Sequence, residues 1–504
     1  MERRGKSRPV AAVTLALTAA CAVSGCAVGP DFVQPRAAVE TGWTASSASV
    51  PVAGDVETPQ AWWARFADPT LDELLALARL RNPDVLAAAY RVEQAAAQLR
   101  IDRSAAWPSA QLQADIDYSN PDQASQLLGR DGDSLTSAQI GVAASWEPDF
   151  WGKARRSIQA GRADWLSSIA AWRAAEVSLD ATVASTYFTL RTYQQRVQIA
   201  ESNLAQQREN LRIARVRFEA GESSELDLRQ AETQYEQTRS QVPPLRAAVA
   251  QAEHALATLV GEVPDFYHRQ FGARATRPTA PTAVPGGIPR DLLRRRPDVR
   301  QAEYTAAAQS ARIGQAQAAL YPSLTLSGSL SSYSSDARGQ SLNDVFSWGD
   351  PIQSVSAGLL LPLFDRGRLT AQVRVQDAAF TQAVLAYQAQ VLKAQREVED
   401  ALVNIDGSLA ALDSLRRATS AAKRSADLAL LRYKSGETDY TTVTSADQSR
   451  LQVEDSLAQT EGDLLQAYVD AYRALGGGWS GEMDPPRLPV RESAATPAFP
   501  TTLR

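Results

Sequence analysis

The sequence predicts a mainly α-helical protein that also carries a membrane β-barrel, and in which one structural unit occurs twice. Three observations support this fold class. Short matches recur at a constant spacing, four segments alternate between apolar and polar residues, and the stretches 152–220 and 367–435 contain no proline. A repeat of this kind determines the architecture, because each copy of the unit is expected to fold in an equivalent way.

The repeat consists of sparse matches at an offset of 214 residues, which becomes 215 after one inserted residue. We therefore expect a first repeat at 61–265, a linker at 266–288 and a second repeat at 289–479. The main matching pairs are Asn82-Pro83-Asp84-Val85 with Arg296-Pro297-Asp298-Val299, Trp107-Pro108-Ser109 with Tyr321-Pro322-Ser323, Arg217-Phe218 with Arg432-Tyr433, and Gly221-Glu222 with Gly436-Glu437.

Each repeat should contain a helix, a strand hairpin, a very long helix, a turn and a shorter helix. Apolar residues occupy every second position from Ala110 to Tyr118, which is the period of a strand. Three further segments alternate in the same way. The predicted bounds are 107–149 and 321–363 for the hairpins, 152–220 and 367–435 for the long helices, and 223–260 and 438–475 for the shorter helices.

The four strands have a length that suits a tilted membrane crossing, with apolar side chains toward lipid and polar ones toward a wet lumen. Aromatic residues at the hairpin bases favour this interpretation over hairpins packed on a soluble core. Four strands cannot close alone, because an open edge in lipid leaves backbone groups unpaired. Closure must be shared in a ring of copies, and three copies would give twelve strands around a pore.

The long helices would each extend roughly 100 Å at 1.5 Å per residue, which exceeds any globular domain. Apolar residues fall at strict intervals of seven from Val183 to Phe218 and from Val391 to Leu412. This spacing predicts coiled-coil packing next to the turns. Pro243-Pro244 interrupts the shorter helix of the first repeat only, so we expect a kink or break there.

Residues 1–25 are typical of a lipoprotein signal peptide. Basic residues precede a short apolar segment that ends in Val23-Ser24-Gly25-Cys26, which resembles a lipobox with Cys26 as the lipidated residue. A plain secretory signal is the alternative. The residue after the cysteine is Ala27 and not the aspartate associated with inner-membrane retention, so the resemblance implies delivery to the outer membrane. Residues 26–60 should form an extended leader, and 480–504 a disordered tail.

Composition excludes several classes of function. The net charge is −5, without a polybasic segment that would suggest a nucleic-acid partner. Histidine and cysteine are almost absent, being limited to His254, His268, Cys21 and Cys26. We therefore expect no metal site, no cofactor and no enzymatic activity, and we find no phosphate-binding loop or Ser/His/Asp set.

Several motifs resemble the outer-membrane factor family (TolC/OprM-like), and within it the NodT-type lipoproteins of multidrug efflux systems. The resemblance covers essentially the whole mature chain. It implies a homotrimer whose twelve-stranded barrel, in outer-membrane lipid, continues as a helical barrel into the periplasm. The motifs are Leu292-Leu293-Arg294-Arg295-Arg296-Pro297-Asp298-Val299, Ala474-Leu475-Gly476-Gly477-Gly478-Trp479, Ala316 to Ser323, Phe150-Trp151-Gly152 and Phe364-Asp365-Arg366-Gly367.

The resemblance also implies partners and sites. A periplasmic adaptor would dock on the two helix-turn-helix tips, and an inner-membrane transporter would load the duct. Just past each tip, the family places the constriction that closes the periplasmic entrance. The expected docking residues are Arg217, Gly221, Glu222, Arg432, Gly436 and Glu437, and the expected gate residues are Leu226, Asp227, Asp439, Tyr440, Thr441 and Ser445.

The sequence thus predicts a passive exit duct for multidrug efflux. A type I protein-secretion duct on the same fold is the first alternative. A structural periplasmic coiled-coil lipoprotein is the second, and it would form no pore.

Overall fold

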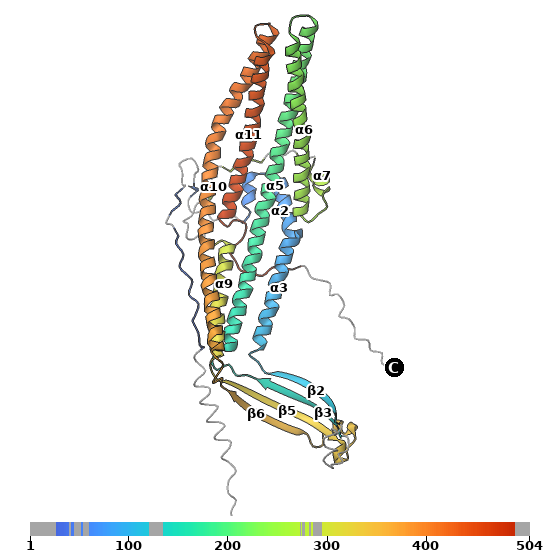
Figure 1. Ribbon diagram of the computed structural model, residues 1–504, viewed down its shortest axis with the longest axis vertical. Coiled ribbons are helices and arrows are strands. Elements are labelled where there is room, and N and C mark those ends of the chain that lie inside the picture. Colours follow the sequence, from blue (N-terminus) through green and yellow to red (C-terminus); the bar gives the residue numbers. More distant parts are fainter. Residues whose placement is uncertain are drawn as a thin grey trace, which may run out of the picture. The chain divides into compact units, whose positions relative to one another are not determined.

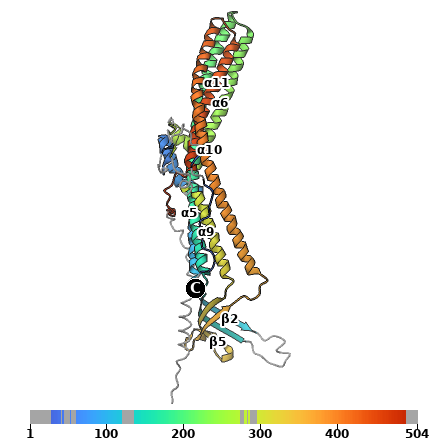
Figure 2. The same ribbon diagram turned by 90° about the vertical axis from the view of Figure 1, so that its left-hand side faces the viewer.

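The computed structural model describes residues 27–39, 42–44, 52–53, 60–119, 135–272, 274, 278–281, 284–285 and 295–488. Within these ranges, the order of helix, strand hairpin, long helix and shorter helix occurs twice (Figures 1 and 2). The internal duplication and the mainly helical fold with a small antiparallel sheet are therefore confirmed. The signal peptide with Cys26, the first hairpin turn and residues 489–504 lie outside the described residues.

The first repeat contains α2 and α3 before the hairpin, and α6 after the long helix α5. Its elements are α2 (Pro69–Arg81), α3 (Pro83–Ser104), β2 (Ser109–Ser119), β3 (Leu135–Trp146), α5 (Lys153–Glu219) and α6 (Glu225–Leu259). The predicted linker contains α7 (Phe266–Phe271) and β4 (Val284–Pro285), and β4 pairs in parallel with β1 (Val52–Ala53) of the leader.

The second repeat follows the same plan. Its elements are α9 (Pro297–Ala318), β5 (Ser323–Ser335), the short 3₁₀ helices η2 (Asp336–Arg338) and η3 (Leu342–Phe346), β6 (Ile352–Leu360), α10 (Arg368–Lys434) and α11 (Tyr440–Ala474). Both long helices thus begin one residue after the predicted start and end one residue before the predicted end. Among the described residues, none of the helices has both the length and the apolarity that crossing a bilayer requires.

The chain divides into two compact units, and each contains segments of both repeats. Unit 1 consists of Met1–Pro35, Glu93–Ser167 and Glu303–Ala386, and unit 2 of Arg36–Val92, Ser168–Ala302 and Tyr387–Arg504. The compact units therefore do not coincide with the repeats, because equivalent segments of the two repeats pack side by side.

Unit 1 contains an antiparallel sheet with the strand order β2-β3-β5-β6. The central pair joins the repeats, with Val142 opposite Leu330 and Trp146 opposite Leu326. At the base of the sheet, the Trp151 indole stacks on Tyr321 with ring centroids 4.7 Å apart and donates a 2.8 Å hydrogen bond to a backbone carbonyl oxygen. In the described residues, β2 and β6 each pair with one strand only, so both are sheet edges.

The start of the leader is fixed within unit 1. The Arg156 guanidinium is buried, donates to the carbonyl oxygens of Val28 and Gly29, and lies 2.9 Å from the Asp31 carboxylate. The backbone N–H of Val28 donates to the carbonyl oxygen of Trp151 at 3.0 Å. The first described residues of the leader are thereby held at the junction between the first hairpin and α5.

Unit 2 has an aromatic core around the 3₁₀ helix η1 (Trp62–Phe66). Trp62 stacks on Tyr472 at 5.2 Å, and Phe66 contacts Phe188 at 4.8 Å. All four rings are almost completely buried. This core joins the segment before α2 to the long helix of the first repeat and to the last helix of the second.

In unit 2, each repeat fixes its own end by an equivalent hydrogen bond. The Asn82 side chain donates to the carbonyl oxygen of Leu259 at 2.9 Å, and Arg296 donates to that of Ala474 at 3.0 Å. These carbonyl groups end α6 and α11, where the helix leaves its last acceptors without an intrahelical partner. The duplication is therefore visible in side-chain contacts as well as in element order.

Of the expected kink or break at Pro243-Pro244, the break is wrong, because α6 continues through both prolines as one helix. A proline within a helix leaves the carbonyl group four residues earlier without its donor. Here both prolines, and the residues Arg239 and Ser240 that lose a donor, lie on an exposed face. Water can bond to these carbonyl groups, so the helix need not end.

Candidate functional site: the two helical tips

The tips that join α5 to α6 and α10 to α11 share one backbone conformation. Gly221 and Gly436 have φ angles of +74° and +76°. The N–H of Glu222 donates to the carbonyl oxygen of Arg217 at 2.8 Å, and that of Glu437 to the carbonyl oxygen of Arg432 at 2.9 Å. This is the Schellman arrangement, which requires a residue that tolerates positive φ. The predicted glycines therefore terminate the two long helices.

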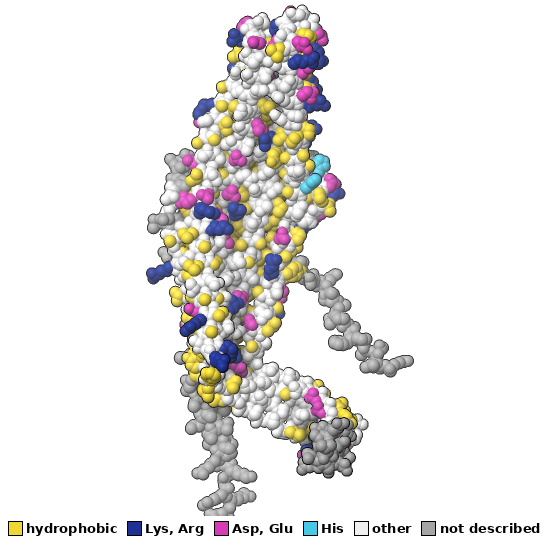
Figure 3. All heavy atoms as spheres, viewed as in Figure 1, with side chains coloured by type: hydrophobic (Ala, Val, Ile, Leu, Met, Phe, Trp, Pro, Cys, Tyr) yellow, Lys and Arg dark blue, Asp and Glu magenta, His cyan; other side chains and the backbone are white. Residues whose placement is uncertain are grey.

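The side chains of the two tips differ although their backbones match. The Arg217 side chain is only 15% exposed, lies 3.7 Å from the Glu222 carboxylate, and places its guanidinium 4.8 Å from the ring centre of Tyr433. The equivalent Arg432 lies 3.4 Å from Glu437 but is 63% exposed. Arg217 thus joins the first tip to the second, whereas Arg432 projects from the second. Figure 3 shows charged side chains gathered at this end of the helices.

The structure brings three of the predicted gate residues together at the starts of α6 and α11. The Asp227 carboxylate accepts a 3.4 Å hydrogen bond from the backbone N–H of Tyr440. The Thr441 hydroxyl donates to the Gln230 side chain at 3.3 Å. A contact network therefore connects the two hairpins just past their tips.

The remaining gate residues have different surroundings. The Ser445 hydroxyl bonds within its own helix, to the carbonyl oxygen of Thr441 at 3.0 Å. Leu226 is 64% exposed, and Asp439 precedes α11 without capping it through its side chain. Tyr440 is buried against Tyr433, with the rings in a T-shaped contact at 5.2 Å. Burial raises the pKa of the Tyr440 hydroxyl, so it stays neutral at physiological pH.

Small side chains hold the four helices together behind the tips. Ala214, Ala231 and Ala429 are buried with Tyr433 and Val443 in one cluster. The offset of 215 relates Ala214 to Ala429 and Ala231 to Ala446, which packs on the same cluster. Equivalent small residues therefore lie in equivalent places in the two hairpins, and they allow the helices to approach closely.

A buried polar network, which the sequence interpretation missed as a set, lies further from the tips. The Asn210 side-chain amide donates to the Asp447 carboxylate at 2.8 Å, and Arg450 lies 3.2 Å from that carboxylate. Burial raises the pKa of Asp447, while Arg450 and Asn210 oppose this shift. Asp447 and Arg450 are three residues apart on a helix, and this spacing could have predicted their ion pair from the sequence. Asn210 could be recognised only from the packing of α5 on α11.

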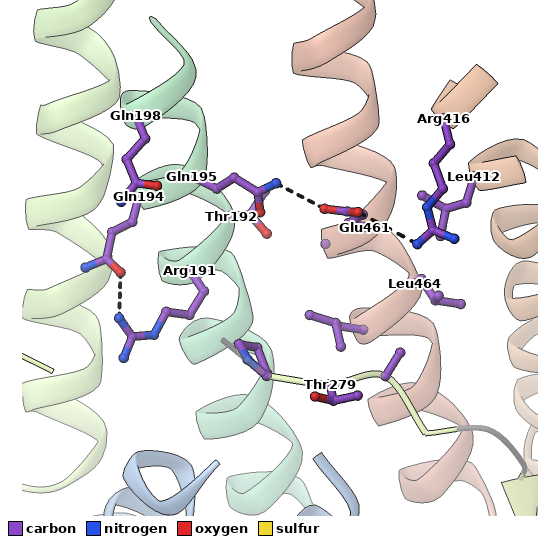
Figure 4. Close-up of a pocket in the computed structure, with 14 residues that line it drawn as sticks. Arg191, Thr192, Gln194, Gln195, Gln198, Thr279, Leu412, Arg416, Glu461 and Leu464 are labelled. Carbon is purple, nitrogen blue, oxygen red and sulfur yellow. Dashed lines mark hydrogen bonds and ion pairs between the residues drawn. The ribbon is translucent and has the colours of Figure 1, made fainter. Parts of the chain in front are cut away.

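A polar groove in unit 2 lies between α5, α10 and α11 (Figure 4). Gln195 donates to Glu461 at 3.0 Å, and Arg416 lies 3.9 Å from the same carboxylate. Arg191 donates to Gln194 at 2.8 Å. These side chains are engaged with one another rather than arranged around a reacting group. Within the described ranges, no set of three or more His, Cys, Asp or Glu side chains is placed to hold a metal ion.

Comparison with known proteins decides the family. The model of the outer membrane efflux protein family matches residues 74–262 and again 288–477, one block for each repeat. The chain belongs to the outer membrane efflux protein family. The resemblance predicted from the sequence motifs is thereby confirmed.

Relatives of this efflux protein cover nearly its full length. It is 31% identical to nodulation protein T of Rhizobium leguminosarum bv. viciae, over 94% of this chain and 95% of the relative. It is 31% identical to the solvent efflux pump outer membrane protein SrpC of Pseudomonas putida, over 93% of this chain and 98% of the relative.

A solved structure supports the same assignment. The outer-membrane channel OprN superimposes with a TM-score of 0.82 at 32% identity, over 90% of this chain and 100% of that one. The protein is accordingly an outer-membrane efflux channel, as predicted.

Proposed function

We propose that three copies of this efflux protein form one channel, which serves as the passive exit duct of a tripartite multidrug efflux system. The observation that carries the proposal is the sheet of unit 1, in which β2 and β6 are both edges among the described residues. In a membrane, an unpaired strand edge is too costly to remain open. A second copy of the same chain offers the complementary edge.

The duplication specifies how these edges would pair. Ser109 and Ser323 are equivalent, and their partners are Ser145 and Leu360, so β3 and β6 are related by 215 residues. If each strand is replaced by its counterpart in the other repeat, the pairing of β3 with β5 predicts a pairing of β6 with β2 of the next copy. Val142 lies opposite Leu330 in the chain. Their counterparts, Ala357 and Ile116, should therefore lie opposite each other between copies. This register keeps apolar residues of both strands on one face of the sheet.

A disulfide across this seam tests the assembly. The only cysteines, Cys21 and Cys26, lie in the predicted signal peptide and lipidation motif, so a processed and lipidated chain would have no free thiol. Directly opposed residues have the Cα spacing that a disulfide needs. We expect oxidation of the Ala357→Cys/Ile116→Cys variant to give covalent dimers and trimers on a denaturing gel.

The matched control is Ala357→Cys/Ala110→Cys, which moves the second cysteine about 20 Å along the strand at roughly 3.3 Å per residue. It should remain monomeric. Cross-linking that stops at dimers, or equal yields from both variants, would contradict the proposed trimer.

We also propose that a periplasmic adaptor docks on the two tips and connects the channel to an inner-membrane transporter. Glu222 and Glu437 are 65% and 61% exposed, and both follow a turn fixed by glycine. Gly221, Gly436, Arg217 and Arg432 would hold these carboxylates in place. We propose that Leu226, Asp227, Asp439, Tyr440, Thr441 and Ser445 form the periplasmic entrance, with Tyr440 supporting it from inside the hairpins.

Lipidation at Cys26 completes the proposal. Ala27 lies directly against Gly152, and the following residues are fixed by Arg156. The lipid would therefore emerge beside the junction of the first hairpin and α5, within the unit that contains the sheet. Acyl labelling should be lost in Cys26→Ser, and labelling that persists would show that another residue carries the lipid.

Deletion of the gene tests the activity. Susceptibility to several unrelated compounds should rise, and the wild-type gene should restore resistance. If export of a secreted protein is lost while susceptibility is unchanged, the chain is a type I secretion duct instead. A coiled-coil lipoprotein with a structural role would change neither property.

A further inference from the structure

Arg432 lacks at the second tip the environment that Arg217 has at the first. Both arginines lie near the glutamate five residues later, Arg217 at 3.7 Å and Arg432 at 3.4 Å. Arg217 also covers Tyr433 with its guanidinium, which leaves it 15% exposed, against 63% for Arg432. The two arginines therefore differ by one aromatic contact.

The internal duplication identifies the missing contact. The two repeats alternate around a closed ring of three copies. With near-sixfold symmetry, the step from the first hairpin to the second would match the step from the second hairpin to the first hairpin of the next copy. At the offset of 215 residues, the counterpart of Arg217 is Arg432, and the counterpart of Tyr433 is Phe218. The arginine and the aromatic ring are thus both retained, and Phe218 is 38% exposed in the single chain.

The glycines of the tips show a second contact of the same Arg217 guanidinium. A side-chain carbon at Gly436 would lie 3.4 Å from the Arg217 guanidinium, whereas one at Gly221 would meet nothing within 4 Å. If each residue is again replaced by its counterpart in the other repeat, Arg432 of one copy should lie beside Gly221 of the next. The space at Gly221 is therefore where the equivalent guanidinium would lie.

We propose that Arg432 of each copy packs over Phe218 and beside Gly221 of the neighbouring copy, while it keeps its contact with its own Glu437. This inference rests on the proposed trimer. The entrance would then be surrounded by six equivalent arginine–aromatic contacts, three within chains and three between them. Only the three between chains join separate copies, so opening of the ring between subunits must break them.

Cross-linking between two different copies tests the contact directly. One tagged copy carries only Arg432→Cys, and a second, differently tagged copy carries only Phe218→Cys. Both residues are exposed in the single chain, so neither change threatens folding. A short bismaleimide should join the two copies into a heterodimer. A pair with Val216→Cys in place of Phe218→Cys is the matched control, because Val216 is also exposed but points to another side of the helix.

The strand disulfide separates this inference from the trimer itself. If Ala357→Cys/Ile116→Cys forms trimers but the Arg432→Cys and Phe218→Cys copies link no better than the control, the tip contact is wrong and the trimer stands. If neither pair links, the trimer and the tip contact are both overturned.

A double-mutant cycle measures whether the two side chains act together on entry through the channel, which cross-linking does not show. In cells without the pump, Arg432→Ala and Phe218→Ala should each increase entry of a large antibiotic several-fold, and the double variant should add nothing further. Arg432→Lys keeps the cation and should stay near wild type. Additive effects of the two alanine changes would overturn the proposed contact.

Discussion

Arg296 shows how one residue of a family motif stabilises the fold. Its buried guanidinium lies 2.6 Å from both Asp298 and Glu397 and donates to the carbonyl oxygen of Ala474. Burial alone would raise the pKa of Asp298, but the hydrogen bonds and positive charge of Arg296, together with hydrogen bonds from the Val299 N–H and Gln390, hold that pKa below its usual value. Arg296 therefore connects the start of the second repeat with α10 and with the end of α11.

Replacing Arg296 by methionine should lower the unfolding free energy by about 3 kcal/mol at pH 7, because two partly buried carboxylates lose their cation. The contribution of Asp298 is present above its unfolded pKa of about 4 and is lost as the pH falls through its lower folded value. Thermal denaturation at pH 7 and at pH 3 should therefore show a smaller difference between variant and wild type at pH 3.

Arg295→Met is the matched control for this prediction. Arg295 precedes Arg296 and is exposed, so the same loss of charge should change stability little. An equal loss from both variants would show that charge in this segment matters, rather than the buried contacts of Arg296.

At the scale of elements, the tip glycines test the backbone strain of the two turns. Gly221→Ala and Gly436→Ala both force a side chain into positive φ, which costs roughly 1–2 kcal/mol. The methyl group at Gly436 also comes within 3.4 Å of the Arg217 guanidinium, which is an ordinary van der Waals contact with a flexible side chain. We expect hydrogen exchange to show weaker protection of both hairpins, by a similar amount for the two variants. Unchanged protection in Gly221→Ala would contradict the strain argument.

Much of the element plan could be predicted from the sequence, because it depends on local periodicity and on the repeat. The long helices α5 and α10 begin and end within one residue of their predicted bounds. The expected break at Pro243-Pro244 was wrong because the cost of the prolines depends on the surroundings of the freed carbonyl groups. That the residues concerned lie on an exposed face is known only from the folded helix.

The candidate site was predictable in position but not in detail. Glycine and arginine at each tip could be identified from the matching motifs. The different burial of Arg217 and Arg432 could not, because it depends on which hairpin lies next to each one in space. The contact of Asn210 with Asp447 joins residues 237 positions apart and leaves no local pattern.

At the scale of the whole molecule, one chain is a third of the ring in the proposed trimer. Each contact between its two repeats predicts a contact between neighbouring copies, with the roles of the repeats exchanged. The sheet edges and the tips both have this property, although they belong to different compact units. The strand seam would close the channel in the membrane, and the tip seam would surround its periplasmic entrance.

Single-channel recording of purified, disulfide-locked Ala357→Cys/Ile116→Cys trimers tests the central claim, that three chains close one channel. In planar bilayers, the locked trimers should give discrete current steps of the same size as the reduced protein, because the disulfide only fixes a seam that is already formed. Locked trimers that carry no current, or steps produced only by species other than trimers, would contradict it.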